Sequence, residues 1–341
     1  MRAVGYRTPG AIDAPDSLVD IELPKPEPGP RDLIVEIRAV SVNPVDTKVR
    51  RRAGADTPDG WKVLGWDAAG VVVQTGAEVT RFKPGDEVFY AGALERQGTN
   101  AEYHAVDERI VGRKPASLDF AQAAALPLTA ITAWETLFDR LDVRRPVPGA
   151  AQAILIIGGA GGVGSIAVQL ARRLTDLTVI ASASRPRTEA WVRELGAHHV
   201  VNHSRPLDAE VAALGLGAPA FVFSTTATDR HMEAIAALIA PQGRWALIDD
   251  PGVVDVAPFK RKSVSTHWEF MFTRPMFGTA DIDAQGTLLD EVSRLVDEGV
   301  LRTTLAEHYG PINAANLRRA HALIESGRAL GKIVLEGFGA A

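Results

Sequence analysis

A glycine-rich turn between an apolar run and a helical stretch constrains the fold of this chain more than any other segment. The sequence ILIIGGAGGVGSIAVQLA places Gly159-x-Gly161-x-x-Gly164 directly after a short apolar strand and at the start of an amphipathic stretch. Glycines at this spacing let a pyrophosphate approach the backbone, and the following helix offers N–H donors and partial positive charge. No Gly-Lys-Ser or Gly-Lys-Thr follows, which excludes a P-loop. The turn therefore predicts a dinucleotide site in which Gly159, Gly161, Gly162, Val163 and Gly164 bind the cofactor.

Apolar runs and helical stretches alternate along the chain after this turn. Each apolar run has the length of a buried strand, and each is separated from the next by a stretch with helical spacing. This alternation predicts an α/β fold with a doubly wound parallel sheet. The predicted strands are 177–184, 198–204, 219–226 and 243–250, and the predicted helices are 187–197, 207–215 and 231–240.

The first 120 or so residues show a different pattern, with short strand-like runs broken by proline and glycine. Residues 32–43 alternate apolar and polar side chains, Pro84-Gly85 indicates a turn, and residues 101–111 form a further strand candidate. These features predict a mostly antiparallel β domain. Residues 119–141 predict two helices that are interrupted near Pro127, because proline cannot donate a helix hydrogen bond.

After residue 300 the chain becomes strand-like again and ends with an amphipathic helix and a last strand. We therefore expect two domains. Residues 1–126, completed by 300–341, form the β-rich substrate and catalytic domain, and residues 127–299 form the cofactor domain.

Composition excludes several classes of function. A hydrophobic content of 46% with 23% charged residues is ordinary for a globular protein, and the net charge of −5 argues against nucleic acid as a partner. The chain has no cysteine, which excludes disulfides, thiolate nucleophiles, cysteine-ligated zinc and iron–sulfur clusters. No apolar run reaches the roughly 20 residues of a membrane span, and the first residues lack a signal-peptide core. We expect a cytoplasmic protein with no membrane partner, and we expect Arg50–Arg52 to lie in a solvated loop.

The end of the second predicted strand of the cofactor domain favours NADPH over NADH. NAD sites usually place an acid there to accept from the ribose 2′-hydroxyl. This chain instead reads IASASRPR, with Ser184, Arg185 and Arg187 and no acid before Glu189. A serine hydroxyl and guanidinium groups suit a 2′-phosphate, which an acid would repel.

The whole chain resembles the medium-chain dehydrogenase/reductase superfamily, with a GroES-like domain followed by a Rossmann domain. Its motifs GDEVFYAG, NAEYHAVDE, AALPLTAITAWE and GGAGGVGSIAVQLAR are similar to those of the quinone oxidoreductase branch. SVNPVDTKVR, ASASRP, LIDDP and HWEFMFTRP resemble more narrowly the group named zinc-type alcohol dehydrogenase-like proteins.

The resemblance also indicates that this chain has lost the metal site of its zinc-containing relatives. Those relatives carry a cysteine, then Gly-His-Glu, then a second cysteine, where this chain has Asn43, then Gly65-Trp66-Asp67, then Ala125. None of the usual three zinc ligands is present, and the four-cysteine structural lobe is missing as well. We expect no metal. We expect Trp66 to fill the space of the lost site, and Asp67 to pair with a nearby arginine or lysine.

A protein of this family without zinc is expected to reduce acceptors that are already electrophilic. Hydride transfer to a quinone or an α,β-unsaturated carbonyl delocalises the negative charge onto oxygen, so the protein needs to orient the substrate, exclude water and donate hydrogen bonds. Asn43 is the first candidate donor to the substrate, the alternative being a structural asparagine before Pro44. Asp46 and Lys48 lie on the same turn and are candidates for a proton relay, or pair with each other.

The family pattern assigns further residues to the cofactor. It places Thr129 against the nicotinamide, Phe223 and Ser224 near the nicotinamide ribose, and Ile248 and Asp249 near the carboxamide. His203 is expected to stack on or cap the adenine, while His267 and Phe272 belong to a loop that relatives place over the nicotinamide, although His267 is equally consistent with an ordinary core or surface histidine.

The predicted function is that of a zinc-independent, NADPH-dependent oxidoreductase acting on a small quinone or enone. Two alternatives remain. One is a zinc-free alcohol dehydrogenase or aldehyde reductase, and the other is a non-catalytic NADPH-binding protein with a second role on nucleic acid. Relatives commonly pair through the edge strands of their Rossmann sheets, so the resemblance implies a homodimer.

Overall fold

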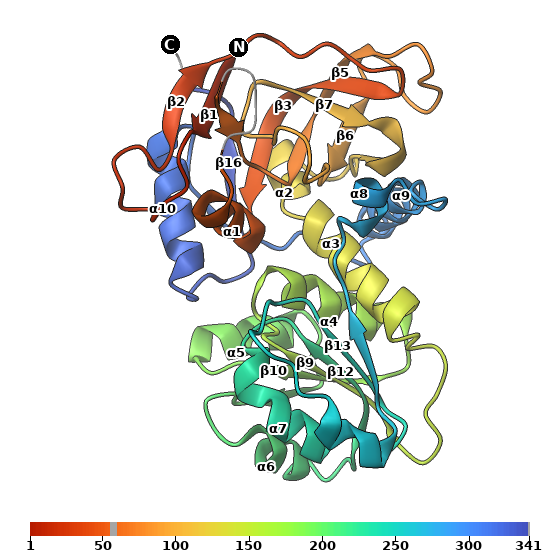
Figure 1. Cartoon of the computed structure of the whole chain (residues 1–341). Helices are drawn as coiled ribbons and strands as arrows, with labels where there is room; N and C mark the ends of the chain where they lie inside the picture. Colours follow the sequence, from red (N-terminus) through yellow and green to blue (C-terminus); the bar gives the residue numbers. More distant parts are fainter. Residues whose placement is uncertain (55–59, 340–341) are drawn as a thin grey trace. The chain divides into compact units, whose positions relative to one another are not determined.

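The computed structural model describes residues 1–54 and 60–339, and the chain divides into two compact units (Figure 1). The first unit comprises Met1–Ile131 and Phe272–Ala341, and the second comprises Thr132–Met271. We expected residues 127–131 and 272–299 in the second unit, and both segments lie in the first. The later segment contains helix α9 (Ala284–Asp297), which is bound to the first unit because Asp290 accepts from the Arg113 amide at 2.8 Å and from Arg81 at 2.9 Å.

The first unit is built on a mostly antiparallel sheet, as the alternating pattern of residues 32–43 predicts. Its long central strand β3 pairs antiparallel with β5, β7 and β16. The order across the main sheet is β15-β16-β3-β5-β6-β8, and a smaller sheet has the order β2-β1-β4. The strands are β1 (Arg2–Tyr6), β2 (Val19–Glu22), β3 (Asp32–Val42), β4 (Lys62–Val63), β5 (Ala68–Thr75), β6 (Glu87–Tyr90), β7 (Tyr103–Asp107), β8 (Val111–Arg113), β15 (Leu305–His308) and β16 (Lys332–Glu336).

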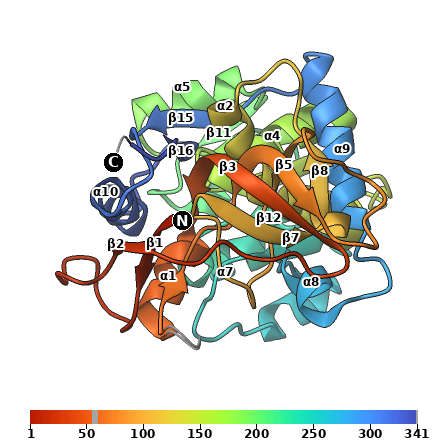
Figure 2. The same ribbon diagram turned by 90° about the horizontal axis from the view of Figure 1, so that it is seen from above.

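Helices cover this β structure, and the view from above shows α10 on the same side as β15 and β16 (Figure 2). The expected interruption before Pro127 is present, since α2 ends at Ala124 and α3 begins at Pro127. The helices of this part are α1 (Pro44–Arg52), α2 (Phe120–Ala124), α3 (Pro127–Trp134), α8 (Thr273–Phe277), α9 and α10 (Ala314–Glu325), with a 3₁₀ turn at Glu108–Ile110.

The expectation that Arg50–Arg52 form a solvated loop was wrong. All three residues belong to α1, and the Arg50 side chain is 0% exposed. Its guanidinium donates to Gly10 O at 2.8 Å and to His321 Nδ1 at 3.3 Å, and it pairs with the Glu325 carboxylate. The guanidinium can be buried because these acceptors take the hydrogen bonds that water would otherwise accept. Arg51 and Arg52 are exposed, as expected.

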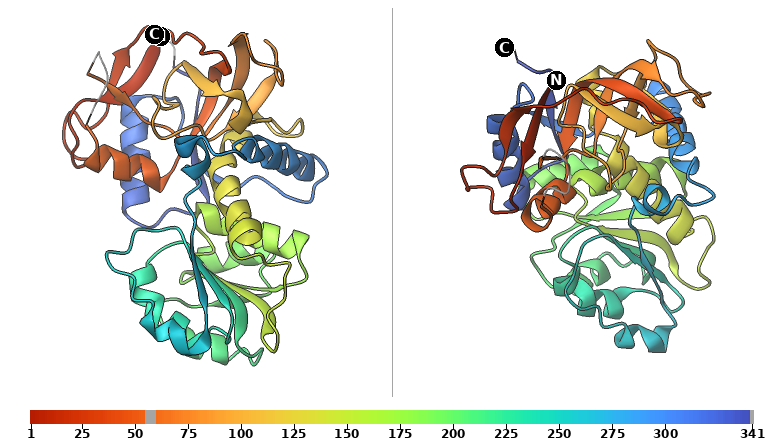
Figure 3. Two further views of the ribbon diagram at one scale, coloured as in Figure 1. Left: turned by 45° about the vertical axis from the view of Figure 1, so that its right-hand side comes forward. Right: turned by 45° about the horizontal axis from the view of Figure 1, so that its top comes forward.

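The second unit is a doubly wound parallel sheet, as the alternation of strands and helices predicts. Its order is β11-β10-β9-β12-β13-β14, with every adjacent pair parallel. Helices α4 and α5 lie on one side of the sheet and α6 and α7 on the other (Figures 1 and 3). The strands are β9 (Ala151–Ile157), β10 (Thr178–Ser182), β11 (His199–Val201), β12 (Pro219–Ser224), β13 (Arg244–Leu247) and β14 (Ser265–Trp268).

The helices of this unit coincide with the predicted helical stretches to within a few residues. They are α4 (Gly162–Leu174), α5 (Pro186–Glu194), α6 (Leu207–Ala212) and α7 (Thr228–Leu238), with a π-helix at Glu135–Arg140 and a 3₁₀ helix at Ala257–Lys262. Edge strand β14 is an addition, because His267 was expected to belong to a loop and lies in this strand. Within the described ranges, no helix is both long and apolar enough to span a bilayer.

The buried arginine of α1 yields a stability prediction. Arg50→Ala leaves Glu325 and Gly10 O without their donor, so we expect the free energy of unfolding to fall by about 3 kcal/mol. The matched control Arg51→Ala removes an exposed arginine of the same helix and changes the free energy by less than about 0.5 kcal/mol. Urea unfolding measures both, and equal effects of the two substitutions would contradict the buried role of Arg50.

Candidate functional site

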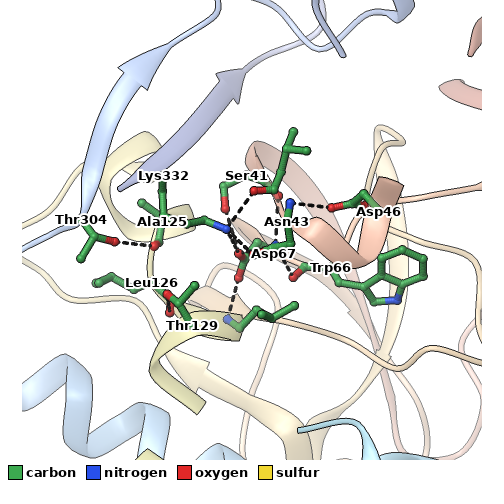
Figure 4. Close-up of polar contacts among 12 residues, drawn as sticks. Ser41, Asn43, Asp46, Trp66, Asp67, Ala125, Leu126, Thr129, Thr304 and Lys332 are labelled. Atoms are coloured by element: carbon green, nitrogen blue, oxygen red, sulfur yellow. Dashed lines mark hydrogen bonds and ion pairs between the residues drawn. The ribbon is translucent and has the colours of Figure 1, made fainter. Parts of the chain in front are cut away.

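A buried polar cluster lies where three segments of the first unit meet (Figure 4). Asn43 follows the end of β3, Asp67 precedes β5, and Lys332 opens β16. Their exposed fractions are 1%, 0% and 2%. Charged groups are seldom buried so completely unless their partners satisfy them, so the contacts of the cluster define its chemistry.

The Asp67 carboxylate is the acceptor at the centre of this cluster. Oδ2 accepts from Ser41 Oγ at 2.8 Å, from Asn43 Nδ2 at 2.8 Å and from Lys332 Nζ at 2.9 Å. Oδ1 accepts from the Leu128 amide at 2.7 Å. The expected pairing of Asp67 with an arginine or lysine is therefore confirmed, and the partner is Lys332.

Backbone geometry before β5 requires glycine at position 65. Gly65 has φ +114°, a conformation that L side chains rarely adopt, and a Cβ there would lie 2.5 Å from Thr99 Oγ1. The turn is tied to the next segment, since Thr99 N donates to Gly65 O at 3.0 Å. Gly65 thus allows the tight path that precedes Trp66 and Asp67.

Asn43 has its hydrogen-bonding groups occupied within the cluster. Its amide nitrogen donates to Asp67 Oδ2 at 2.8 Å and to Trp66 O at 3.2 Å, and its Oδ1 accepts from Lys332. Donation to a substrate would require one of these bonds to break. The expectation that Asn43 polarises the substrate stays a prediction, and the described geometry gives it the structural role that was its alternative.

Asp46 stands apart from the rest of the cluster because one of its oxygens has no partner. It is 1% exposed in the first turn of α1, where Oδ2 accepts from the Asn43 backbone amide at 2.7 Å. Oδ1 is buried and has no hydrogen-bond partner among the described residues. Burial raises the pKa of Asp46 from 3.8 to about 7, against the opposing effects of the Asn43 amide and the Lys332 charge. Lys48 is half-buried two residues along the same helix.

The Trp66 side chain is buried beside the cluster, as expected. Its side chain is 1% exposed, its indole N–H donates to Ala93 O at 3.2 Å, and its ring meets Phe272 edge-on with centroids 6.2 Å apart. Ala125 is buried too, and its carbonyl accepts from Thr304 at 3.0 Å. Thr129 is 2% exposed and donates to Leu126 O at 3.0 Å.

In the second unit, the glycine turn has the geometry of a pyrophosphate cradle. A Cβ at Gly164 would lie 2.2 Å from Gly158 O, so only glycine lets α4 approach the end of β9 so closely. A Cβ at Gly161 would meet nothing nearer than Gly158 O at 3.5 Å, which leaves the start of the helix open. The residues present therefore fit a dinucleotide at the N-terminus of α4.

The end of β10 carries hydroxyl, imidazole and guanidinium groups. Ser182 Oγ accepts from the Gly158 amide at 2.9 Å and lies 3.0 Å from His203 Nδ1. Burial, and then the neighbouring His231 and Arg185, lower the pKa of His203. Ser184 is half-buried and Arg185 is exposed just beyond the strand. This combination fits the predicted preference for a phosphorylated ribose, which remains untested.

The strand ends β12 and β13 hold the other predicted cofactor residues. Phe223 and Ser224 are both 0% exposed, and Ser224 Oγ accepts from Trp245 Nε1 at 3.1 Å. The Ile248 amide donates to Ser224 O at 3.3 Å. The Asp249 carboxylate accepts from Thr228 N at 2.9 Å and from Thr228 Oγ1 at 2.5 Å, so it caps the start of α7. The expected contact of these residues with a cofactor stays a prediction.

A second buried acid was not anticipated from the sequence. Glu269 follows β14, is 3% exposed, and accepts from Arg140 Nε at 2.8 Å. Burial and the adjacent Glu135 carboxyl raise the pKa of Glu269 to about 9. His267 lies close by in β14, with its Nε2 buried and without a hydrogen-bond partner in the described part of the chain.

Comparisons with known proteins identify the family. Residues 29–116 match the alcohol dehydrogenase GroES-like domain, and residues 195–335 match the zinc-binding dehydrogenase model. A zinc-type alcohol dehydrogenase-like protein of Staphylococcus aureus is 37% identical over 340 residues, which cover 98% of this chain and 99% of that protein. A human mitochondrial NAD(P)H oxidoreductase is 30% identical over 335 residues, covering 90% of this chain and 82% of the relative.

Solved structures agree with this likeness. A Rhizobium etli structure, named for a zinc-dependent alcohol dehydrogenase, shares 68% identity with a TM-score of 0.98, covering 100% of this chain and 99% of that one. A quinone oxidoreductase of Pseudomonas syringae shares 26% identity with a TM-score of 0.82, covering 98% and 99%.

The metal that these family names imply does not fit the residues of this chain. In the register expected from the resemblance, Asn43, Trp66 and Ala125 take the three ligand positions, and neither an indole nor a methyl group binds zinc. The lysine that completes the cluster is a cation and would repel a metal. Among the described residues, no group of three histidine, aspartate or glutamate side chains is placed to hold a metal.

The partnerless oxygen of Asp46 leads to a pH prediction. A pKa raised from 3.8 to about 7 means that the folded state keeps a proton that the unfolded state has already released. The stability contributed by protonated Asp46 is complete below about pH 4 and falls as pH rises to 7, by up to about 1.4 kcal/mol per pH unit. The Asp46→Asn side chain cannot titrate, yet it keeps an oxygen for the Asn43 amide. The free energy of unfolding of this variant should therefore lose the part of its pH dependence that comes from Asp46.

Urea unfolding between pH 4 and 8 measures the difference between wild type and Asp46→Asn. Asp16→Asn, at an exposed position of the same unit, is the matched control and should follow the wild-type curve. Parallel curves for wild type and Asp46→Asn would show that Asp46 is already ionised at acidic pH.

Proposed function

The chain belongs to the medium-chain dehydrogenase/reductase superfamily, and we propose that it is a zinc-independent, NADPH-dependent oxidoreductase of quinones or α,β-unsaturated carbonyl compounds. This proposal rests on the residues that this chain has at the zinc-ligand positions of the family. Asn43, Trp66 and Ala125 replace the ligands, and a buried ammonium–carboxylate pair, Lys332 with Asp67, joins the segments around them.

This replacement favours conjugated acceptors over simple alcohols. Alcohol oxidation needs a group that stabilises an alkoxide, which a metal ion does in zinc-containing enzymes. Lys332 cannot do so while its three N–H groups are donated to Val42 O, Asn43 Oδ1 and Asp67 Oδ2. A quinone or enone carries the developing charge on its own conjugated oxygen, so orientation, water exclusion and weak donors are sufficient.

The second unit supplies the cofactor site in this proposal. When bound, NADPH supplies the hydride. Gly159, Gly161, Gly162, Val163 and Gly164 hold the pyrophosphate, which the open start of α4 supports. Ser184, Arg185 and His203 bind the phosphorylated ribose and the adenine, and the nearby strand ends contribute Phe223, Ser224, Ile248 and Asp249.

In the first unit we assign Thr129 and Phe272 to the nicotinamide and Asp46 to proton handling. Asp46 is the acid of the buried cluster with an uncommitted oxygen, and its raised pKa keeps a proton on it near neutrality. Such a group can return a proton to a reduced product. Lys48, two residues along α1, is assigned to the same relay.

We also propose that the protein forms a homodimer through the edge strand β14. Strand β14 pairs with β13 on one side only, and Trp268 at its end is 54% exposed, with Phe270 just beyond it at 47%. An exposed strand edge beside large apolar side chains is a surface that a second copy can cover.

Cofactor preference is tested by binding. We expect NADPH to bind at least about tenfold more tightly than NADH, because charge-assisted hydrogen bonds to the 2′-phosphate are worth roughly 1.5–3 kcal/mol. Arg185→Ala should remove most of this difference, whereas Arg193→Ala, an exposed arginine in the last turn of α5, should preserve it. Nucleotide fluorescence titration gives the dissociation constants, and equal affinities in wild type would contradict the NADPH assignment.

Substrate class is tested by a panel of quinones, conjugated enones, unconjugated aldehydes and alcohols with both cofactors. We expect NADPH oxidation with quinones or enones and little turnover of the unconjugated compounds. Turnover confined to aldehydes and alcohols would instead identify a zinc-free alcohol dehydrogenase or aldehyde reductase. If no acceptor is reduced and RNA binds in a salt-dependent way, the protein is a non-catalytic NADPH-binding protein.

A further inference from the structure

Lys332 is a buried cation of the first unit, at the centre of the Asp67 cluster, and the proposed chemistry leaves it without a role. Its ammonium donates to Val42 O at 3.0 Å, to Asp67 Oδ2 at 2.9 Å and to Asn43 Oδ1. An ammonium has three N–H groups, and all three are used here. Lys332 is therefore neither a free donor nor a proton source for a substrate.

The acceptors of this ammonium come from two segments of the main sheet. Val42 and Asn43 lie at the end of β3, and Asp67 directly precedes β5. Lys332 joins them from β16, which pairs with β3. The ammonium therefore connects segments that are far apart in the sequence.

The effect of this cation reaches α3 through Asp67. The Asp67 oxygen that does not contact Lys332 accepts from the Leu128 amide at 2.7 Å. Pro127, the first residue of α3, has no N–H, so the Leu128 amide is the first N–H of the helix. A carboxylate at this point caps the helix and interacts favourably with its dipole. Thr129, assigned above to the nicotinamide, is the next residue.

We propose that Lys332 holds the Asp67 carboxylate in place and that through Asp67 it positions the start of α3. Lys332 is a positioning residue, because it is saturated by protein acceptors. Its contribution to turnover rests on the proposed function, whereas its effect on α3 does not.

The test removes both charges and keeps the shape of the pair. Lys332→Met with Asp67→Asn avoids an unpaired buried charge and retains a carbonyl oxygen for the Leu128 amide. The matched control is Lys114→Met with Glu87→Gln, which removes another ion pair of the same unit with a 3.1 Å separation. Lys332→Arg retains the charge and serves as the conservative variant. If the double variant does not fold, Asp67→Asn alone is compared with the same control.

The first readout is hydrogen exchange of residues 126–131, which needs no substrate. We expect exchange to accelerate at least about fivefold in the double variant, because the charged cap is lost, and to be unchanged in the Lys114/Glu87 control. The second readout is kinetic. With the best acceptor, kcat should fall at least about tenfold while the dissociation constant of NADPH stays within about twofold, and Lys332→Arg should recover part of the loss.

Wild-type exchange and wild-type kcat in a folded double variant would overturn the proposal, and would show that the pair only contributes to packing. If wild type reduces no acceptor, the proposed function fails, but the exchange readout still decides whether Lys332 and Asp67 position α3.

Discussion

The ion pair between Lys332 and Asp67 is the interaction on which the first unit depends. It joins residues 265 positions apart and is completed by Ser41, Asn43 and the Leu128 amide. Burying two charges is costly unless their polar atoms find partners, and here all three N–H groups of Lys332 and both carboxylate oxygens of Asp67 take part in hydrogen bonds. Loss of either partner would leave a charge in a site with almost no access to water, so the pair requires β3, β5, β16 and α3 to stay together.

This pair also determines which chemistry the unit can support. The end of β3 and the residue before β5 are joined by an ammonium whose hydrogens are all donated to protein oxygens. The Trp66 side chain is buried beside this cluster, and one oxygen of Asp46 has no hydrogen-bond partner among the described residues. A centre of this kind can orient groups and hold a proton, which suits the reduction of an acceptor that is already electrophilic.

Local patterns allowed much of this fold to be predicted, and long-range pairing explains what was missed. The glycine turn and the buried runs after it predicted the parallel sheet, because a βαβ unit leaves its signature within about 30 residues. The helix break before Pro127 was predicted from a local pattern too, whereas a cationic partner of Asp67 was expected from the family resemblance. The identity of Lys332 was not, since nothing near either residue specifies a partner 265 positions away. The burial of Arg50 in α1 was missed for the same reason. Its neighbours in the sequence indicate a solvent-exposed arginine, whereas its partners Gly10 and Glu325 are distant in the sequence.

The most direct test of this account is the zinc response of the purified protein. Protein prepared in zinc-supplemented medium should contain far less than one zinc per chain by mass spectrometry of the metal. Its turnover of a quinone or enone with NADPH should be unchanged after dialysis against a strong chelator. Stoichiometric zinc, together with loss of turnover on chelation and recovery on adding zinc back, would contradict the zinc-independent chemistry proposed for this chain.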